Sequence, residues 1–278
     1  MFALFGELFS YSFLVRALIV GSLVALCAAL LGVSLVLKRY SMIGDGLSHV
    51  SFGALSIAIA VGWSPLKLSI PVVALAAFFL LRITESAKVK SDAAIAMISA
   101  VSLSVGILVT SFTTGMNTDV SSYMFGSILA MTREDVICSL ALSAVVLVLY
   151  VFFYNKIQIT SPDRTVERTD HLNATGVNVS LYNSLIAVLT AVTIVLGMRM
   201  MGAMLISSLV IFPALTAMRL FKSFRGVVIA SGVLSLVCFC VGIVFSYAAS
   251  APAGASVVLV NLAAFVMFSL AALVRGKL

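Results

Sequence analysis

Long apolar runs alternate with short polar links along the whole chain. Each run is about 20 residues long, which is the length that an α-helix needs to cross the hydrocarbon core of a bilayer. The runs lack the strict alternation of a membrane β-strand, so the pattern favours helices. It predicts nine spans, at residues 13–37, 42–61, 66–82, 93–112, 135–154, 181–198, 202–220, 227–247 and 256–274.

Composition agrees with an integral membrane protein. The chain is 62% hydrophobic and 10% charged, whereas a soluble domain is about half apolar and about a quarter charged. Its 278 residues hold eight or nine spans and little else. We therefore expect an all-α polytopic membrane protein with a single transmembrane domain over residues 1–278. The formal charge of +7 does not indicate a nucleic-acid partner, because the bases are scattered in ones and twos between apolar runs.

The distribution of basic residues predicts the orientation. Thirteen of the 17 bases fall in the links that follow the first, third, fifth, seventh and ninth spans. The positive-inside rule then places the N-terminus outside and the C-terminus in the cytoplasm. The thirteen are Lys38, Arg39, Arg82, Lys88, Lys90, Lys156, Arg164, Arg168, Arg219, Lys222, Arg225, Arg275 and Lys277.

Asp45 and His49 are the most informative polar residues in the predicted spans. On a helix they lie one above the other on a single face. Carboxylate oxygen and imidazole nitrogen are ligands of first-row divalent metals. A charged side chain within a span costs about 2.5–3.5 kcal/mol and is tolerated where it faces water, a partner or an ion. We interpret the pair as handling a divalent cation that crosses the membrane.

A purely structural interpretation of the same pair stays open. Asp45 would then lie among the cytoplasmic headgroups and cap its span, while His49 would bond to a neighbouring helix. The flanking Gly44 and Gly46 permit an irregular backbone, as at ion sites in transporters. One chain supplies only two ligands, so a four-ligand site needs a second copy, backbone carbonyls or water.

The longest polar segment, residues 155–180, is predicted to lie in the cytoplasm and to contain a short helix. Ser161 suits an N-cap, Pro162 the first helical position, Asp163 the positive helix end and Gly176 the C-terminal stop. The segment is either a solvated connector or a helix that docks against a cytoplasmic partner.

Three further features complete the pattern. Residues 113–131 contain an apolar patch too short to cross, which predicts a re-entrant or interfacial segment. Pro213 removes a backbone hydrogen bond in the seventh span and predicts a kink. Arg199 is interpreted as a snorkelling anchor.

The sequence lacks a G-x-x-x-x-G-K-[ST] phosphate loop, so it does not bind ATP in that way.

Several short motifs, in this order, resemble the membrane permease subunits of zinc/manganese-type ABC importers. The resemblance covers essentially the whole chain. The departures are Ser127, where many members have an Asp after Phe-Gly, and a charged coupling region without the common Phe-Asp start. The motifs are Gly44-Asp45-Gly46-Leu47-Ser48-His49 followed by Gly53, Tyr123-Met124-Phe125-Gly126-Ser127-Ile128-Leu129, Ala174-Thr175-Gly176, Arg199-Met200-Met201-Gly202, Phe212-Pro213-Ala214-Leu215-Thr216-Ala217, and Ser246-Tyr247 with Pro252-Ala253-Gly254-Ala255.

This resemblance implies an importer permease fold of the vitamin B12 and metal importer type in a bacterial plasma membrane. It also implies a homodimeric or paired-permease pore, a cytoplasmic ATPase dimer and an extracytoplasmic metal-binding protein. The transported substrate would be Mn²⁺, Zn²⁺ or Fe²⁺, without a permanently bound cofactor, and Asp45 and His49 would line its path, with Gly44, Gly46 and Pro213 shaping the helices. The residues implied in ATPase coupling are Ser161, Pro162, Asp163, Arg164, Glu167, Arg168, Ala174 and Gly176.

Two other functions are weighed against this one. A self-sufficient secondary transporter would use Asp45 and His49 to exchange protons for substrate, but one carboxylate and one imidazole make a sparse relay. An intramembrane enzyme would use the same two residues as an acid and a base or as metal ligands, but the pair lacks a nucleophile. We therefore expect a transport subunit that is not itself an enzyme.

Overall fold

The computed structural model describes residues 12–85, 91–114, 126, 133–161 and 178–274. This part of the chain forms ten helices, and nine of them are long and apolar enough to cross a membrane. The all-α polytopic prediction is therefore confirmed. The helices are α2 (Ser12–Leu37), α3 (Ile43–Val61), α4 (Pro65–Glu85), α5 (Ser91–Thr114), α7 (Arg133–Phe152), α8 (Tyr154–Thr160), α10 (Val179–Met201), α11 (Ala203–Leu220), α12 (Phe224–Ala249) and α13 (Ala253–Val274).

The observed helices match the predicted spans to within a few residues, except after the fifth. That span was expected to reach Tyr154, but α7 ends at Phe152 and the short helix α8 follows it. Ile157 of α8 is completely buried and Thr160 nearly so. The first turns of the segment predicted as a polar link are therefore packed on the bundle.

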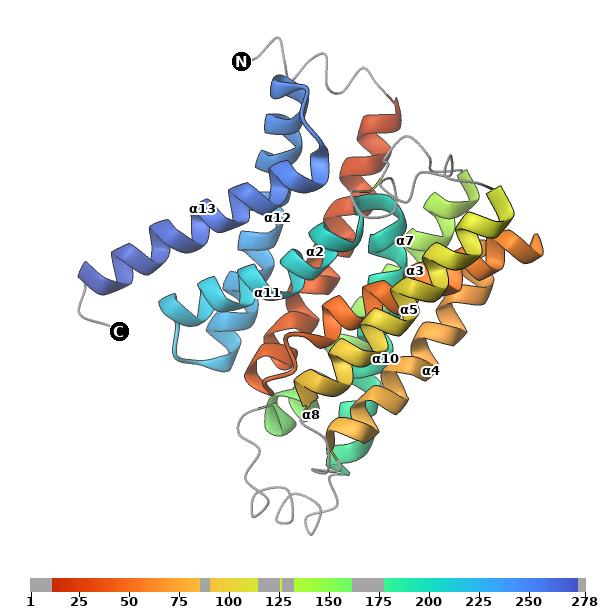
Figure 1. The fold of residues 1–278 in the computed structure, drawn as a ribbon. Helices are drawn as coiled ribbons and strands as arrows, with labels where there is room; N and C mark the ends of the chain where they lie inside the picture. The colour runs from red at the N-terminus through yellow and green to blue at the C-terminus, as the bar shows by residue number, and fades with distance from the viewer. Residues whose placement is uncertain (1–11, 86–90, 115–125, 127–132, 162–177, 275–278) are drawn as a thin grey trace.

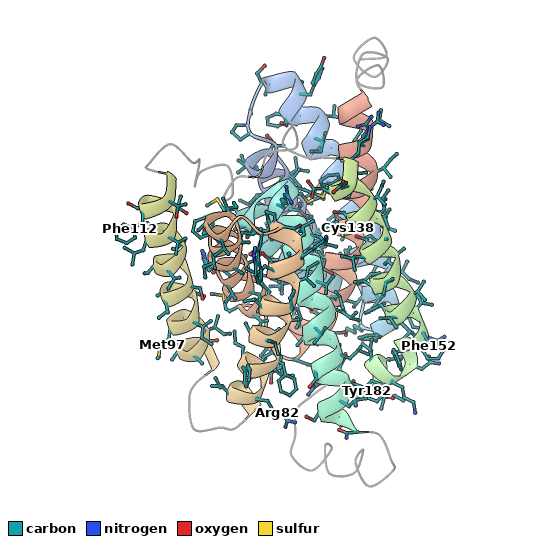
Figure 2. The ribbon with its side chains drawn as sticks, turned by 90° about the vertical axis from the view of Figure 1, so that its right-hand side faces the viewer. Arg82, Met97, Phe112, Cys138, Phe152 and Tyr182 are labelled. Carbon is teal, nitrogen blue, oxygen red and sulfur yellow. The ribbon has the colours of Figure 1, made fainter. Side chains whose placement is uncertain are left out.

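The helices form a central group and a periphery (Figure 1). α2, α3 and α10 are mostly buried, whereas most residues of α5, α7 and α13 are at least partly exposed. α5 lies at one edge of the bundle, with Met97 and Phe112 directed away from it (Figure 2). An apolar outer surface of this kind suits a lipid environment or a second membrane subunit.

Glycine residues allow two of the close contacts between helices. A Cβ atom at Gly32 of α2 would lie 2.0 Å from the backbone oxygen of Val210 of α11. A Cβ atom at Gly53 of α3 would lie 2.8 Å from the backbone oxygen of Ser102 of α5. Glycine at both positions lets the helix backbones touch, as is common between membrane helices.

Candidate metal pathway

Asp45 and His49 lie on one face of α3, one turn apart, as the sequence predicts. The His49 Nε2 atom is 3.7 Å from the Asp45 Oδ2 atom, and the two side chains are 21% and 44% exposed, respectively. Two ligand atoms held about 2.1 Å from one metal ion at a tetrahedral angle are about 3.4 Å apart. A small side-chain movement would therefore let both residues bind the same cation.

The first turn of α3, which carries Asp45, lies beside the middle of α11. Gly44, next to Asp45, faces the side chain of Val210, with 3.8 Å between the Val210 Cγ1 atom and the position of an added Cβ. Val210 is ten residues from the end of α11 at Leu220, which is about 15 Å of helix. Asp45 is also in the first turn of α3, where the helix dipole favours a carboxylate. The N-cap residue is Met42, which makes no side-chain cap hydrogen bond.

The backbone around the pair is regular. α3 runs without interruption from Ile43, so the irregular backbone that Gly44 and Gly46 would permit does not occur there. Gly46 instead permits close packing, because a Cβ atom there would lie 2.7 Å from the Ile95 side chain of α5. The glycines thus bring α5 and α11 against the two sides of the turn that carries Asp45.

An apolar cluster follows the pair toward the C-terminal end of α3. Phe52, one turn beyond His49, is buried together with Leu55, Met198 and Ala203. Its ring lies over Gly106 of α5, where an added Cβ would be 2.5 Å away. Asp45 and His49 therefore lie next to a closed, apolar section of the bundle.

The residues predicted to couple an ATPase to the membrane helices are only partly described by the structure. Ser161 is buried at the end of α8, and its hydroxyl donates to the Ser34 Oγ atom of α2 at 3.1 Å. The helix that Ser161 was predicted to cap lies outside the described part of the chain, so its role as an N-cap stays a prediction. The other predicted coupling residues lie outside the described part of the chain: Pro162, Asp163, Arg164, Glu167, Arg168, Ala174 and Gly176.

Two further contacts join helices at the end of the bundle where α8 lies. Lys38, at the end of α2, is buried, and its ammonium group donates to the side-chain oxygen of Asn183 of α10. Tyr154 of α8 packs on the Phe224 ring at the start of α12, with 5.8 Å between ring centroids. Burial raises the pKa of the Tyr154 phenol, although the Arg225 guanidinium opposes that shift. The phenol therefore stays protonated near neutral pH, as a hydrogen-bonding group.

The interpretation of Arg199 as a snorkelling anchor is wrong. Its Nη1 atom donates to the Oδ1 atom of Asp135 at 2.9 Å, which joins the end of α10 to the start of α7. Nearby, Gly126 has φ +79°, and a Cβ atom there would lie 2.2 Å from the Met201 backbone carbon. The Arg199–Asp135 ion pair and the backbone of Gly126 therefore both lie at the end of α10.

Two points about the predicted site residues remain, the position of Pro213 and the number of possible metal ligands. Pro213 is buried within α11, which is helical from Ala203 to Leu220, and the kink there stays a prediction. Among the described residues there is no cluster of three or more His, Cys, Asp and Glu side chains that could hold a metal ion. Asp45 and His49 are a pair and not part of a larger cluster of this kind in the described part of the chain.

The profile of the ABC 3 transport family matches residues 10–272, which is nearly the whole chain. The chain belongs to this family. The resemblance stated from the sequence motifs is therefore confirmed.

Individual proteins similar to this chain agree with this assignment. The manganese import system permease protein ScaB of Streptococcus gordonii is 27% identical over 94% of this chain and 91% of its own length. The high-affinity zinc uptake system membrane protein ZnuB of Haemophilus influenzae is 26% identical over 92% of this chain and 97% of its own. The solved structure of PsaBC from Streptococcus pneumoniae in complex with Fab has a TM-score of 0.84 and 28% identity, and the match covers 96% of this chain and 95% of that one.

Proposed function

We propose that this ABC-family chain is the permease subunit of an ATP-driven importer of divalent transition-metal ions. The observation that carries the proposal is the Asp45–His49 pair, one turn apart on α3, whose first turn lies beside the middle of α11. Oxygen and nitrogen ligands suit Mn²⁺, Zn²⁺ or Fe²⁺, and the names of ScaB and ZnuB refer to manganese and zinc. The metal is the transported substrate, and the permease needs no permanently bound cofactor.

ATP hydrolysis resides in a separate cytoplasmic ATPase dimer, because the sequence has no phosphate loop of its own. Residues 155–180 couple that dimer to the pore. The burial of Ser161 against Ser34 supports this role, since a firmly held base lets force on the segment reach the membrane helices. An extracytoplasmic metal-binding protein delivers the cargo at the opposite end.

A second permease, either another copy or a sibling chain, completes the pore. Asp45 is 44% exposed on its side of α3, and a carboxylate facing lipid costs about 2.5–3.5 kcal/mol. A partner subunit over that side removes this cost and supplies two more ligands. The exposed apolar faces of α5 and α13 offer area for such a contact.

The protein lies in a bacterial plasma membrane, with the N-terminus outside and the C-terminus in the cytoplasm. The clustering of 13 of the 17 bases in alternate links supports this orientation. Asp45 is then in the cytoplasmic half of the pathway, since α3 begins after a cytoplasmic link.

Metal uptake into proteoliposomes that contain the complete transporter tests the proposal. Asp45→Ala and His49→Ala should each abolish ATP-driven uptake while the ATPase subunits still co-purify. Uptake at the normal rate by both variants would refute the assignment of the site. Gradient-driven uptake by the permease alone, without any ATPase, would instead support a secondary transporter.

A further inference from the structure

The hydroxyl group of Ser99 on α5 is buried and has no hydrogen-bond partner among the residues that the structure describes. Helical serines and threonines usually donate to the carbonyl group four residues earlier. Three neighbours on the same helix do so: Ser104, Thr110 and Thr113 donate to Ala100, Gly106 and Val109 at 2.7–2.8 Å. Ser99 does not make this bond to its own helix, so its oxygen is available to another group.

Ser99 faces the turn of α3 that carries His49. Its Oγ atom lies 3.4 Å from the position of a Cβ atom on Gly46. α3 and α5 run in parallel there, because Gly46 meets Ile95 while Gly53 meets Ser102. His49 is three residues after Gly46 and four before Gly53, so it belongs to the same stretch of the α3–α5 contact.

The acceptors on α3 itself that are near the His49 ring are occupied or directed elsewhere. The carbonyl of Asp45, one turn before His49, already accepts the Ser48 hydroxyl at 2.7 Å. The Asp45 carboxylate lies on the Nε2 side of the imidazole. Ser51 also has an unpartnered hydroxyl. It is two positions after His49, which places it about 200° around the helix axis, on the opposite side of α3. Ser99 is the group from the facing helix that remains.

A histidine that binds a metal through one ring nitrogen almost always donates the N–H of the other to an acceptor. A serine oxygen has two acceptor lone pairs. We propose that Ser99 is a positioning residue for metal transport, whose hydroxyl accepts the Nδ1–H of His49 when Nε2 binds the cation. The inference rests on the proposed role of the Asp45–His49 pair and adds a third residue, from α5, to it.

Equilibrium binding of Mn²⁺ to the assembled transporter, together with uptake kinetics, tests this inference. Loss of such a partner weakens metal affinity about 10–100-fold. Ser99→Val should therefore raise the dissociation constant and the half-saturating Mn²⁺ concentration by that factor, while the maximal uptake rate changes little. Ser99→Thr introduces a side chain of the same shape as valine but keeps a hydroxyl, so it should bind Mn²⁺ as the wild type does. Ser104→Ala, on the exposed side of α5, is the matched control and should change neither value.

The outcomes separate the two proposals. Equal Mn²⁺ affinity in Ser99→Val and Ser99→Thr would overturn the role of Ser99, whether both were normal or both were weak. If Ser99→Val does not assemble with the ATPase, the smaller Ser99→Ala replaces it, with the same expected loss of affinity. Asp45→Ala in the same assay reports on the proposed function: normal binding by that variant would refute the pair itself, and loss of binding there with normal binding by Ser99→Val would refute only the Ser99 inference.

Discussion

Replacement of Gly32 by alanine should destabilise the protein by separating α2 from α11. The new Cβ would lie 2.0 Å from the Val210 backbone oxygen, whereas ordinary van der Waals contact begins at 3.4 Å. The two helices must therefore move apart by about 1.4 Å. Overpacking costs about 1–3 kcal/mol, and this overlap with a rigid backbone is at the upper end. Alanine returns about 1 kcal/mol of helix propensity. The expected net loss in free energy of unfolding is about 2 kcal/mol.

Gly44→Ala is the matched control, because it faces the same residue. Its Cβ would lie 3.8 Å from the Val210 side chain, which is ordinary contact. No overlap opposes the gain in helix propensity there, so the expected change is a gain in stability of up to about 1 kcal/mol. Reversible unfolding in mixed micelles, by titration with a denaturing detergent and circular dichroism, measures both variants. Wild-type stability of Gly32→Ala, or an equal loss in Gly44→Ala, would refute the close-packing explanation. Since α11 lies beside Asp45, Gly32→Ala should also lower metal uptake.

Three further predictions concern the two ends of the bundle. A double-mutant cycle of Arg199→Met and Asp135→Asn should give a coupling energy of about 1.5 kcal/mol, because the pair is charged but partly exposed; a value near zero would show that the contact is unimportant. Lys38→Met should raise the ATP hydrolysed per metal ion imported, since it removes the α2–α10 contact at the base of the coupling segment. Lys67→Met, at an exposed position at the start of α4, should leave this ratio unchanged; equal ratios in the two variants would contradict the role of Lys38. Tyr154→Phe should preserve folding, as measured by thermal unfolding, because the ring packing on Phe224 remains; a large fall in melting temperature would mean that the hydroxyl is structurally essential.

The sequence predicts the membrane helices well because one physical requirement, an apolar length that matches the bilayer, dominates their pattern. It also predicts the Asp45–His49 pair, since a four-residue spacing suffices to place two side chains on one helix face. The family assignment followed from short motifs and is confirmed by the family profile.

Contacts between helices are what the sequence does not reveal. Asp135 and Arg199 are 64 positions apart, so Arg199 alone resembles an interfacial anchor. Gly46 suggests backbone irregularity until the Ile95 side chain is seen against it. Ser99 is indistinguishable in the sequence from the other α5 serines, because only packing reveals a hydroxyl without a partner. These features depend on register between helices, which hydropathy does not encode.

Anomalous scattering from a metal-loaded transporter, trapped before ATP hydrolysis, tests the central claim most directly. A crystal that contains Mn²⁺, measured at the manganese edge, should show a peak within coordination distance of the Asp45 carboxylate and the His49 imidazole, and the peak should vanish in His49→Ala. A peak elsewhere along the helices, with both side chains unbound, would contradict the account.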